Sequence, residues 1–173
     1  MILPPDLLIT KELVFDPLGF ESTPAVMEAE SVEYGACSFK LNGMAIRFRT
    51  AKITPTKTGQ FVTLWKRNGT GTIEPYQSTD EIDLFLVSTR KEHHFGQFVF
   101  PKSALIRYGI LSNNGKEGKR AIRIYPPWDE TTSRQAMKTQ EWQLEYFLKI
   151  PEKEAVDETL ARRIYAGVYN LQE

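Results

Sequence analysis

The dipeptide Asn42-Gly43 constrains the fold more than any other feature of this sequence. It separates two alternating runs, 34–41 and 44–50, and Asn-Gly is the preferred pair for a two-residue turn between antiparallel strands. That turn fixes the register of the hairpin, so Cys37 faces Phe48. Because successive side chains point to opposite faces of a sheet, one face is apolar and must be core; it holds Cys37, Phe39, Leu41, Met44, Ile46 and Phe48.

The opposite face of this hairpin is small, polar and basic. It carries Ala36, Ser38, Lys40, Ala45, Arg47 and Arg49, and we expect it at the surface. The same register, extended past the hairpin, sets Glu33 opposite Lys52 on the apolar side. Such a pair is a half-buried ion pair, a remnant of an acid-plus-lysine site, or a pair beyond the end of the sheet.

Further strands are expected over 60–66, 82–88, 95–100 and 121–125. Helices are expected near the start, ending before Asp16-Pro17, and in three later places: after Pro101, over 133–150, and from Pro151 to about Tyr169. Strands first and helices at the ends favour the α+β class, a mixed sheet with flanking helices. No linker divides the 173 residues, so we expect a single domain, 1–173, with 151–173 as a C-terminal helical extension.

The composition is that of a folded soluble protein, with 41% hydrophobic and 25% charged residues. No apolar run approaches the roughly 18 residues of a membrane span, and the first residues lack the basic start of a signal peptide. Cys37 is the only cysteine, which excludes an internal disulfide and favours a buried structural thiol. Together these features predict a cytoplasmic protein without membrane contact.

Charge is distributed very unevenly along the chain. Residues 1–33 carry seven acids and one base, a balance of −6, whereas residues 34–73 carry seven bases and no acid. One interpretation pairs the basic stretch with the acidic N-terminal segment. The other is a binding face for a polyanion. The bases are Lys40, Arg47, Arg49, Lys52, Lys57, Lys66 and Arg67.

Several side chains in and after this stretch would suit a nucleic acid. Guanidinium and ammonium groups neutralise phosphates, and Trp65 between basic residues either stacks on a nucleobase or packs in the core. On the helix expected over 133–150, Trp142 belongs to a second stripe that is core or a contact surface. The acids Asp80 and Asp83 lie in a turn or bind a divalent ion; with only two adjacent histidines, we expect no metal and no cofactor.

The sequence resembles the MepB family over roughly residues 30–150. The matching strings are 33–43, 48–57, 59–62, Trp65-Lys66-Arg67, 95–101, Tyr125-Pro126-Pro127-Trp128-Asp129 and 138–143. The resemblance implies a bacterial protein of a family named for a gene beside a staphylococcal multidrug-efflux pump gene. It also implies a fold near the restriction-endonuclease-like α/β folds.

A nuclease of that fold would hold Mg²⁺ with carboxylates and a lysine on adjacent strands. Residues 34–73 contain no Asp or Glu, and the positions two before Lys52 and Lys66 are Thr50 and Leu64. The residues therefore favour a relative that binds nucleic acid without cleaving it.

Three hypotheses follow. The first is a non-catalytic domain that binds DNA or RNA through Lys40, Arg47, Arg49, Lys52, Lys57, Trp65, Lys66 and Arg67. The second is an enzyme for anionic substrates in which Glu33 and Lys52 meet Asp80 or Asp83 in a cleft. The third is an interaction module linked to efflux regulation. It would form a homodimer through a spare apolar stripe on the last helix: Val156, Leu160, Ile164 and Val168.

Overall fold

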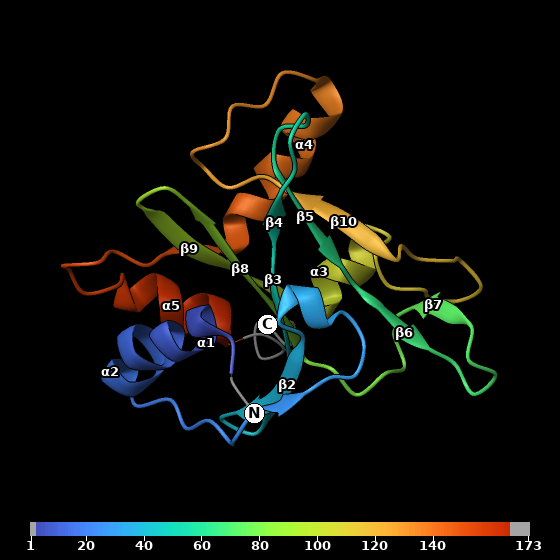
Figure 1. Ribbon diagram of the computed structural model, residues 1–173, viewed down its shortest axis with the longest axis horizontal. Helices are drawn as coiled ribbons and strands as arrows, with labels where there is room; N and C mark the ends of the chain where they lie inside the picture. The colour runs from blue at the N-terminus through green and yellow to red at the C-terminus, as the bar shows by residue number, and fades with distance from the viewer. Residues whose placement is uncertain (1–2, 167–173) are drawn as a thin grey trace.

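A six-stranded sheet forms the centre of the computed structural model, which describes residues 3–166 (Figure 1). The strand order is β1-β2-β3-β8-β9-β11. Neighbours run antiparallel except β3 and β8, which are parallel. The strands are β1 (Val26–Met27), β2 (Cys37–Leu41), β3 (Met44–Thr50), β8 (Leu84–Lys91), β9 (His94–Pro101) and β11 (Phe147–Lys149).

The Asn42-Gly43 hairpin has the predicted register. Cys37 pairs with Phe48 and Leu41 pairs with Met44. Asn42 and Gly43 both have positive φ, 51° and 83°, as a type I′ turn requires. The apolar face lies in the core, where Cys37 and Phe48 are fully buried, so this prediction is confirmed.

Helices cover one face of the large sheet (lower left in Figure 1). They are α1 (Pro5–Thr10), the π-helical turn η1 (Lys11–Phe15), α2 (Asp16–Leu18) and α5 (Glu158–Tyr165). Their apolar side chains share one core with the hairpin, and Phe15 packs edge-on against Tyr165. The expectation that the first helix ends before Asp16-Pro17 is wrong. A proline ring disrupts a regular α-helix, but the turn before Pro17 is the wider π-helical one.

The last helix begins later than predicted. Asp157, not Pro151, caps it, because the Asp157 side chain accepts a hydrogen bond from the Leu160 backbone N–H. Val156 and Ile164 are buried and Leu160 packs against the same core, so the described part of the helix has no spare apolar stripe. Val168 lies outside the described residues, and a homodimer stays a prediction.

A second layer covers the other face of the large sheet. It contains a three-stranded sheet, β10-β5-β4, a two-stranded sheet, β6-β7, and the helices α3 and α4. A second core lies under it, with Phe85, Phe98 and Phe100 of the large sheet fully buried. The bounds are β4 (Lys52–Ile53), β5 (Gln60–Thr63), β6 (Trp65–Arg67), β7 (Ile73–Pro75), α3 (Lys102–Arg107), β10 (Ala121–Ile124) and α4 (Arg134–Gln143).

The strand expected over 60–66 is two strands, β5 and β6. The helix expected over 133–150 is also too long. Ser133 caps α4, but the helix ends at Gln143, and the short helical turn η3 (Leu144–Tyr146) leads into β11. Phe147 pairs with Phe98 and completes the edge of the large sheet. No helix among the described residues is long and apolar enough to cross a membrane.

Candidate nucleic-acid interface

Arg49 is not on the surface where the hairpin pattern places it. Its side chain is fully buried, and its guanidinium donates hydrogen bonds to the backbone carbonyls of Phe48 and Thr63 and to the Tyr76 hydroxyl. It also pairs with the Glu28 carboxylate at 2.8 Å. Alternation separates the two faces of the hairpin, but it does not show that a second layer covers the basic face.

The neighbouring cations are paired in the same way. Glu28 also binds Arg47, and Glu30 lies 2.7 Å from Arg67. Lys66 lies 2.6 Å from Asp80 and 3.7 Å from Glu74. We call Arg47, Arg49, Lys66 and Arg67 the neutralised cluster. For its arginines, the interpretation that pairs the basic stretch with the acidic N-terminal segment is confirmed.

The remaining predicted residues form no ion pair with a carboxylate in the described structure. Lys40 and Lys57 are exposed, and the Lys52 ammonium stands 4.7 Å from the centre of the Tyr34 ring. Trp65 is half-buried beneath the guanidinium of Arg67, 5.4 Å from its ring centre. Trp65 therefore already has a cation over its ring.

No ion pair joins the acids of the enzyme hypothesis to its lysine in the described structure. Glu33 lies in the helical turn η2 (Val32–Tyr34) and forms no ion pair with Lys52 in the described structure. The Asp83 carboxylate accepts the Ala45 backbone N–H, and the Asp80 carboxylate accepts that of Gln77. Within residues 3–166, no three His, Cys, Asp or Glu side chains gather as a metal would require. That Glu33 and Lys52 meet Asp80 or Asp83 in a cleft stays a prediction.

The outer face of the three-stranded sheet carries a different row of side chains. Lys52 of β4 pairs with Phe61 of β5, and Phe61 pairs with Arg123 of β10, so the three side chains stand in line across the sheet. Phe61 is partly exposed, and its ring centre lies 6.2 Å from that of Tyr34. An aromatic ring between two cations is suited to a base flanked by phosphates.

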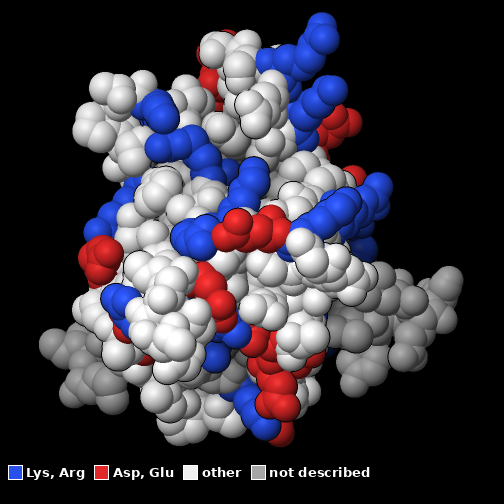
Figure 2. Space-filling view, turned by 90° about the vertical axis from the view of Figure 1, so that its right-hand side faces the viewer, with Lys and Arg blue, Asp and Glu red and all other residues white. Residues whose placement is uncertain are grey.

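An open cleft of about 1000 Å³ continues this row between β10 and α4. Its walls carry Lys119, Arg123, Arg134 and Lys138, with Tyr125 at the same cleft and two acids, Glu141 and Glu145. Across the described residues, none of these four cations pairs with a carboxylate. Figure 2 shows Lys and Arg side chains gathered over the upper half of this side of the molecule. We call Lys52, Lys57, Lys119, Arg123, Arg134 and Lys138 the open basic surface.

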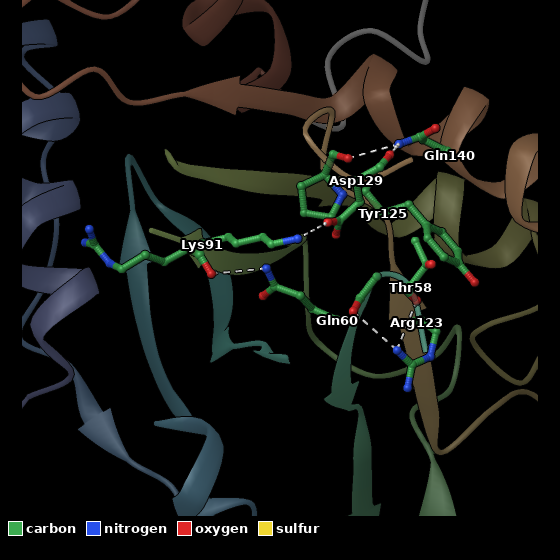
Figure 3. A network of polar contacts seen from close by, with 10 residues as sticks. Thr58, Gln60, Lys91, Arg123, Tyr125, Asp129 and Gln140 are labelled. Carbon is green, nitrogen blue, oxygen red and sulfur yellow. Dashed lines mark hydrogen bonds and ion pairs between the residues drawn. The ribbon is translucent and has the colours of Figure 1, made fainter. Parts of the chain in front are cut away.

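Backbone carbonyls and amide side chains hold the cleft in shape (Figure 3). Arg123 donates to the carbonyls of Thr58 and Gly59, which ties the turn that carries Lys57 to β10. The buried Gln143 of α4 accepts from the Tyr125 N–H and donates to the Arg123 carbonyl. The Gln140 amide donates to three carbonyls, including those of Pro126 and Asp129. These hydrogen bonds hold β10, α4 and the turn that carries Lys57 together, so the backbone that carries the cations of the cleft is fixed.

Trp142 belongs to the core side of the cleft. It stacks on Tyr108 with ring centres 4.1 Å apart, and Phe100 packs against it at 5.5 Å. The core interpretation of Trp142 therefore holds, and Phe61 and Tyr125 are the aromatic rings left for a ligand. Lys119, Arg123 and Arg134 are not predicted from the sequence, although residues 101–149 carry nine bases against five acids.

Comparison with known proteins gives the family. The MepB-like family model matches residues 28–149. The crystal structure of MepB has 30% sequence identity and a TM-score of 0.75, and the match covers 87% of this chain and 99% of that chain. The chain belongs to the MepB-like family. The prediction of MepB membership and of the α+β class is thereby confirmed.

A second solved structure, a bacterial homing endonuclease, is much less similar to this MepB-like chain. It has 13% identity and a TM-score of 0.41, and the match covers 79% of this chain and 87% of that one. A likeness at that level carries no argument about activity. No curated protein matches the chain.

Proposed function

We propose that this MepB-like protein binds nucleic acid without cleaving it, mainly through phosphates held by the open basic surface. The observation that carries the proposal is the set of unpaired cations around the cleft. Lys119, Arg134 and Lys138 line its walls and form no ion pair in the described structure. Ammonium and guanidinium groups without a carboxylate partner are available to phosphate oxygens.

The row on the three-stranded sheet supports the same proposal. A chain of phosphates crossing this sheet toward the cleft would pass Lys52, Phe61 and Arg123 in order. A base turned toward the sheet would meet the partly exposed ring of Phe61. This route uses Lys52 and Lys57 from the sequence prediction and replaces the neutralised cluster with the residues of the cleft.

As part of the same proposal, the protein works in the cytoplasm and has a restriction-endonuclease-like core without the usual acids. Residues 34–73 contain no Asp or Glu, and Glu33 forms no ion pair with Lys52 in the described structure. The enzyme alternative, with Glu33 and Lys52 as its weak candidates, stays a prediction.

The test is fluorescence-anisotropy titration of labelled single- and double-stranded DNA and RNA at several salt concentrations. We expect log affinity to fall linearly with log salt, because each phosphate contact releases counterions. The variant Arg123→Gln/Lys138→Gln should weaken binding and flatten the slope by about 0.7 to 0.9 per lost contact. The matched control is Lys11→Gln/Lys153→Gln, which removes two exposed cations outside both basic regions. Absence of binding to every oligonucleotide at low salt would overturn the proposal.

A further inference from the structure

The carboxylates of Glu28 and Glu30 occupy positions where an oxyanion would bind. The two oxygens of Glu28 are divided between two guanidiniums: one oxygen binds Arg47, and the other lies 2.8 Å from Arg49. Glu30 meets the Nε of Arg67 at 2.7 Å. Paired guanidinium forks around one carboxylate reproduce the geometry that binds a phosphate group.

The chain fixes two of these arginines, Arg49 and Arg67, independently of the carboxylates. Arg49 is held by two backbone carbonyls and the Tyr76 hydroxyl, and Arg67 donates to the Gly71 carbonyl at 2.9 Å. The guanidiniums would therefore keep their positions if another anion replaced the two glutamates. Preorganised donors of this kind are what an anion site needs.

The site opens to the solvent. A cleft of about 430 Å³ is lined by Glu28, Glu30, Arg47 and Arg67 together with Trp65. The side chains of Arg67 and Glu30 are 46% and 35% exposed, whereas Arg49 is fully buried behind Glu28, to which it is bound. An incoming phosphate could therefore reach Arg67 first and Arg47 next.

The segment that carries both glutamates is an edge of the structure. Its strand β1 joins the sheet through only two residue pairs, Val26 with Ser38 and Met27 with Cys37. Beyond it, the Glu28 N–H donates to the Ala36 carbonyl, and Ser31 adopts a left-handed φ of 55°. A short edge strand with few backbone hydrogen bonds opens at lower free energy than the central strands.

We propose that Arg47, Arg49 and Arg67 form a second phosphate-binding site, which residues 28–30 occupy as an internal competitor. The ligand class is a phosphate-bearing polyanion, and its identity as nucleic acid rests on the function proposed above. In the proposed site, the carboxylates of Glu28 and Glu30 occupy the positions that two phosphate groups of the ligand would take. The protein then binds with the open basic surface alone until the segment moves aside, and with both surfaces afterwards.

The first experiment compares Glu30→Gln with Glu33→Gln in the anisotropy assay. Both variants remove one negative charge from the same acidic segment, but only Glu30 pairs with an arginine. We expect Glu30→Gln to bind labelled oligonucleotide about twofold to fivefold more tightly than Glu33→Gln, the range of one exposed charge pair. Its salt slope should be steeper by about 0.7 to 0.9, the value of one added phosphate contact.

The double variant Glu30→Gln/Arg67→Gln decides the mechanism. If the Glu30→Gln variant binds oligonucleotide more tightly because Arg67 has lost its carboxylate partner, this gain in affinity must disappear in the double variant. Equal affinities of Glu30→Gln and Glu33→Gln, or a gain that survives the loss of Arg67, would overturn the inference. Glu28→Gln/Glu30→Gln should give a larger gain. If that variant fails to fold because Arg49 loses its partner, Glu30→Gln alone still gives the answer.

Inorganic polyphosphate separates this inference from the proposed function. If the unaltered protein binds no oligonucleotide, the proposed function fails, and titration with polyphosphate then tests the second site alone. Glu30→Gln must then bind polyphosphate more tightly than Glu33→Gln does. Equal binding of polyphosphate by the two variants would refute the second site whatever the result with oligonucleotides.

Discussion

The neutralised cluster and the open basic surface differ in the groups that neighbour their lysines and arginines. The neutralised cluster faces Glu28, Glu30, Glu74 and Asp80, so each of its cations has a carboxylate within an ion-pair distance. In the described structure, the open basic surface meets backbone carbonyls and aromatic rings instead. The difference shows that the number of basic residues in a stretch does not locate a ligand site. The position of the acids does.

The difference also separates stability from binding. A fully buried arginine must be paired, because desolvating an isolated charge costs several kcal/mol. Arg49 is such a residue, and Glu28 is its partner. An exposed lysine such as Lys138 loses little by standing alone in water, and its charge stays available to a ligand. The two regions should therefore respond differently to the same kind of substitution.

The largest expected effect is on stability at the neutralised cluster. Arg49→Ala should lower the free energy of unfolding by about 3 to 5 kcal/mol, since it leaves the Glu28 carboxylate with one arginine and removes a buried ion-pair partner. Lys138→Ala should change it by no more than about 0.5 kcal/mol. Urea denaturation of both variants measures this. Equal losses would show that the two regions do not differ in this respect.

The next effect concerns the turn that carries Lys57. A Cβ on Gly59 would lie 2.7 Å from the Ile124 carbonyl oxygen and from the Tyr125 ring, whereas a Cβ on Gly71 meets nothing within 4 Å. Both glycines have a φ of 85°. Gly71→Ala should therefore cost about 1 kcal/mol for backbone strain alone, and Gly59→Ala about 2 kcal/mol more for the overlap. Chemical denaturation compares them, and equal costs would mean that the turn is not fixed against β10.

A smaller effect is expected on oligonucleotide affinity, where one lysine of each region can be compared. Lys57 is exposed without a carboxylate partner in the described structure, and Lys66 is held by Asp80 and Glu74. Lys57→Gln should weaken oligonucleotide binding about twofold to fivefold, whereas Lys66→Gln should leave it within error. Anisotropy titration at low salt measures both. A larger loss for Lys66→Gln would assign the phosphate contacts to the neutralised cluster.

The smallest effect is a labelling rate. Burial raises the pKa of the Cys37 thiol to about 12, with the nearby Glu28 carboxylate adding to the rise. At about pH 8 the native thiol is therefore protonated and should react with a disulfide reagent only when the protein opens. Cys37 pairs with Met27 of β1, so Glu28→Gln should speed the reaction, and Lys138→Gln should not. Thiol release followed by absorbance gives both rates. Identical rates would show that Glu28 does not hold the edge segment.

The sequence predicts this fold best where the chemistry is local. The Asn42-Gly43 turn determines the register of β2 and β3, and Ser133 marks the start of α4. The end of α4 was not predictable in this way, because Phe147 and Leu148 suit either the apolar side of a helix or an edge strand. Only the neighbouring β9 decides between the two.

The candidate site was harder to predict because it depends on distant parts of the chain. Arg49 and Glu28 are apart in sequence, and nothing local shows that the second layer buries Arg49. The cleft joins β10 to α4, so Arg123 and Lys138 meet only after both elements pack. Lys52 and Lys57 are exposed, although the hairpin register places Lys52 on the apolar side. Their nucleic-acid contacts stay a prediction.

The single parallel pairing in the large sheet, β3 beside β8, also bears on how the molecule folds. The β2–β3 and β8–β9 hairpins close through short turns, but the parallel pair closes the long connection that contains β4 to β7. Local hairpins form early, and closing a long loop costs conformational entropy before any contact repays it. The joining of the two hairpins is therefore the expected slow step of folding. Since Lys52, Lys57 and Phe61 all lie in the connection it closes, this part of the open basic surface and its aromatic ring are assembled only when that step is complete.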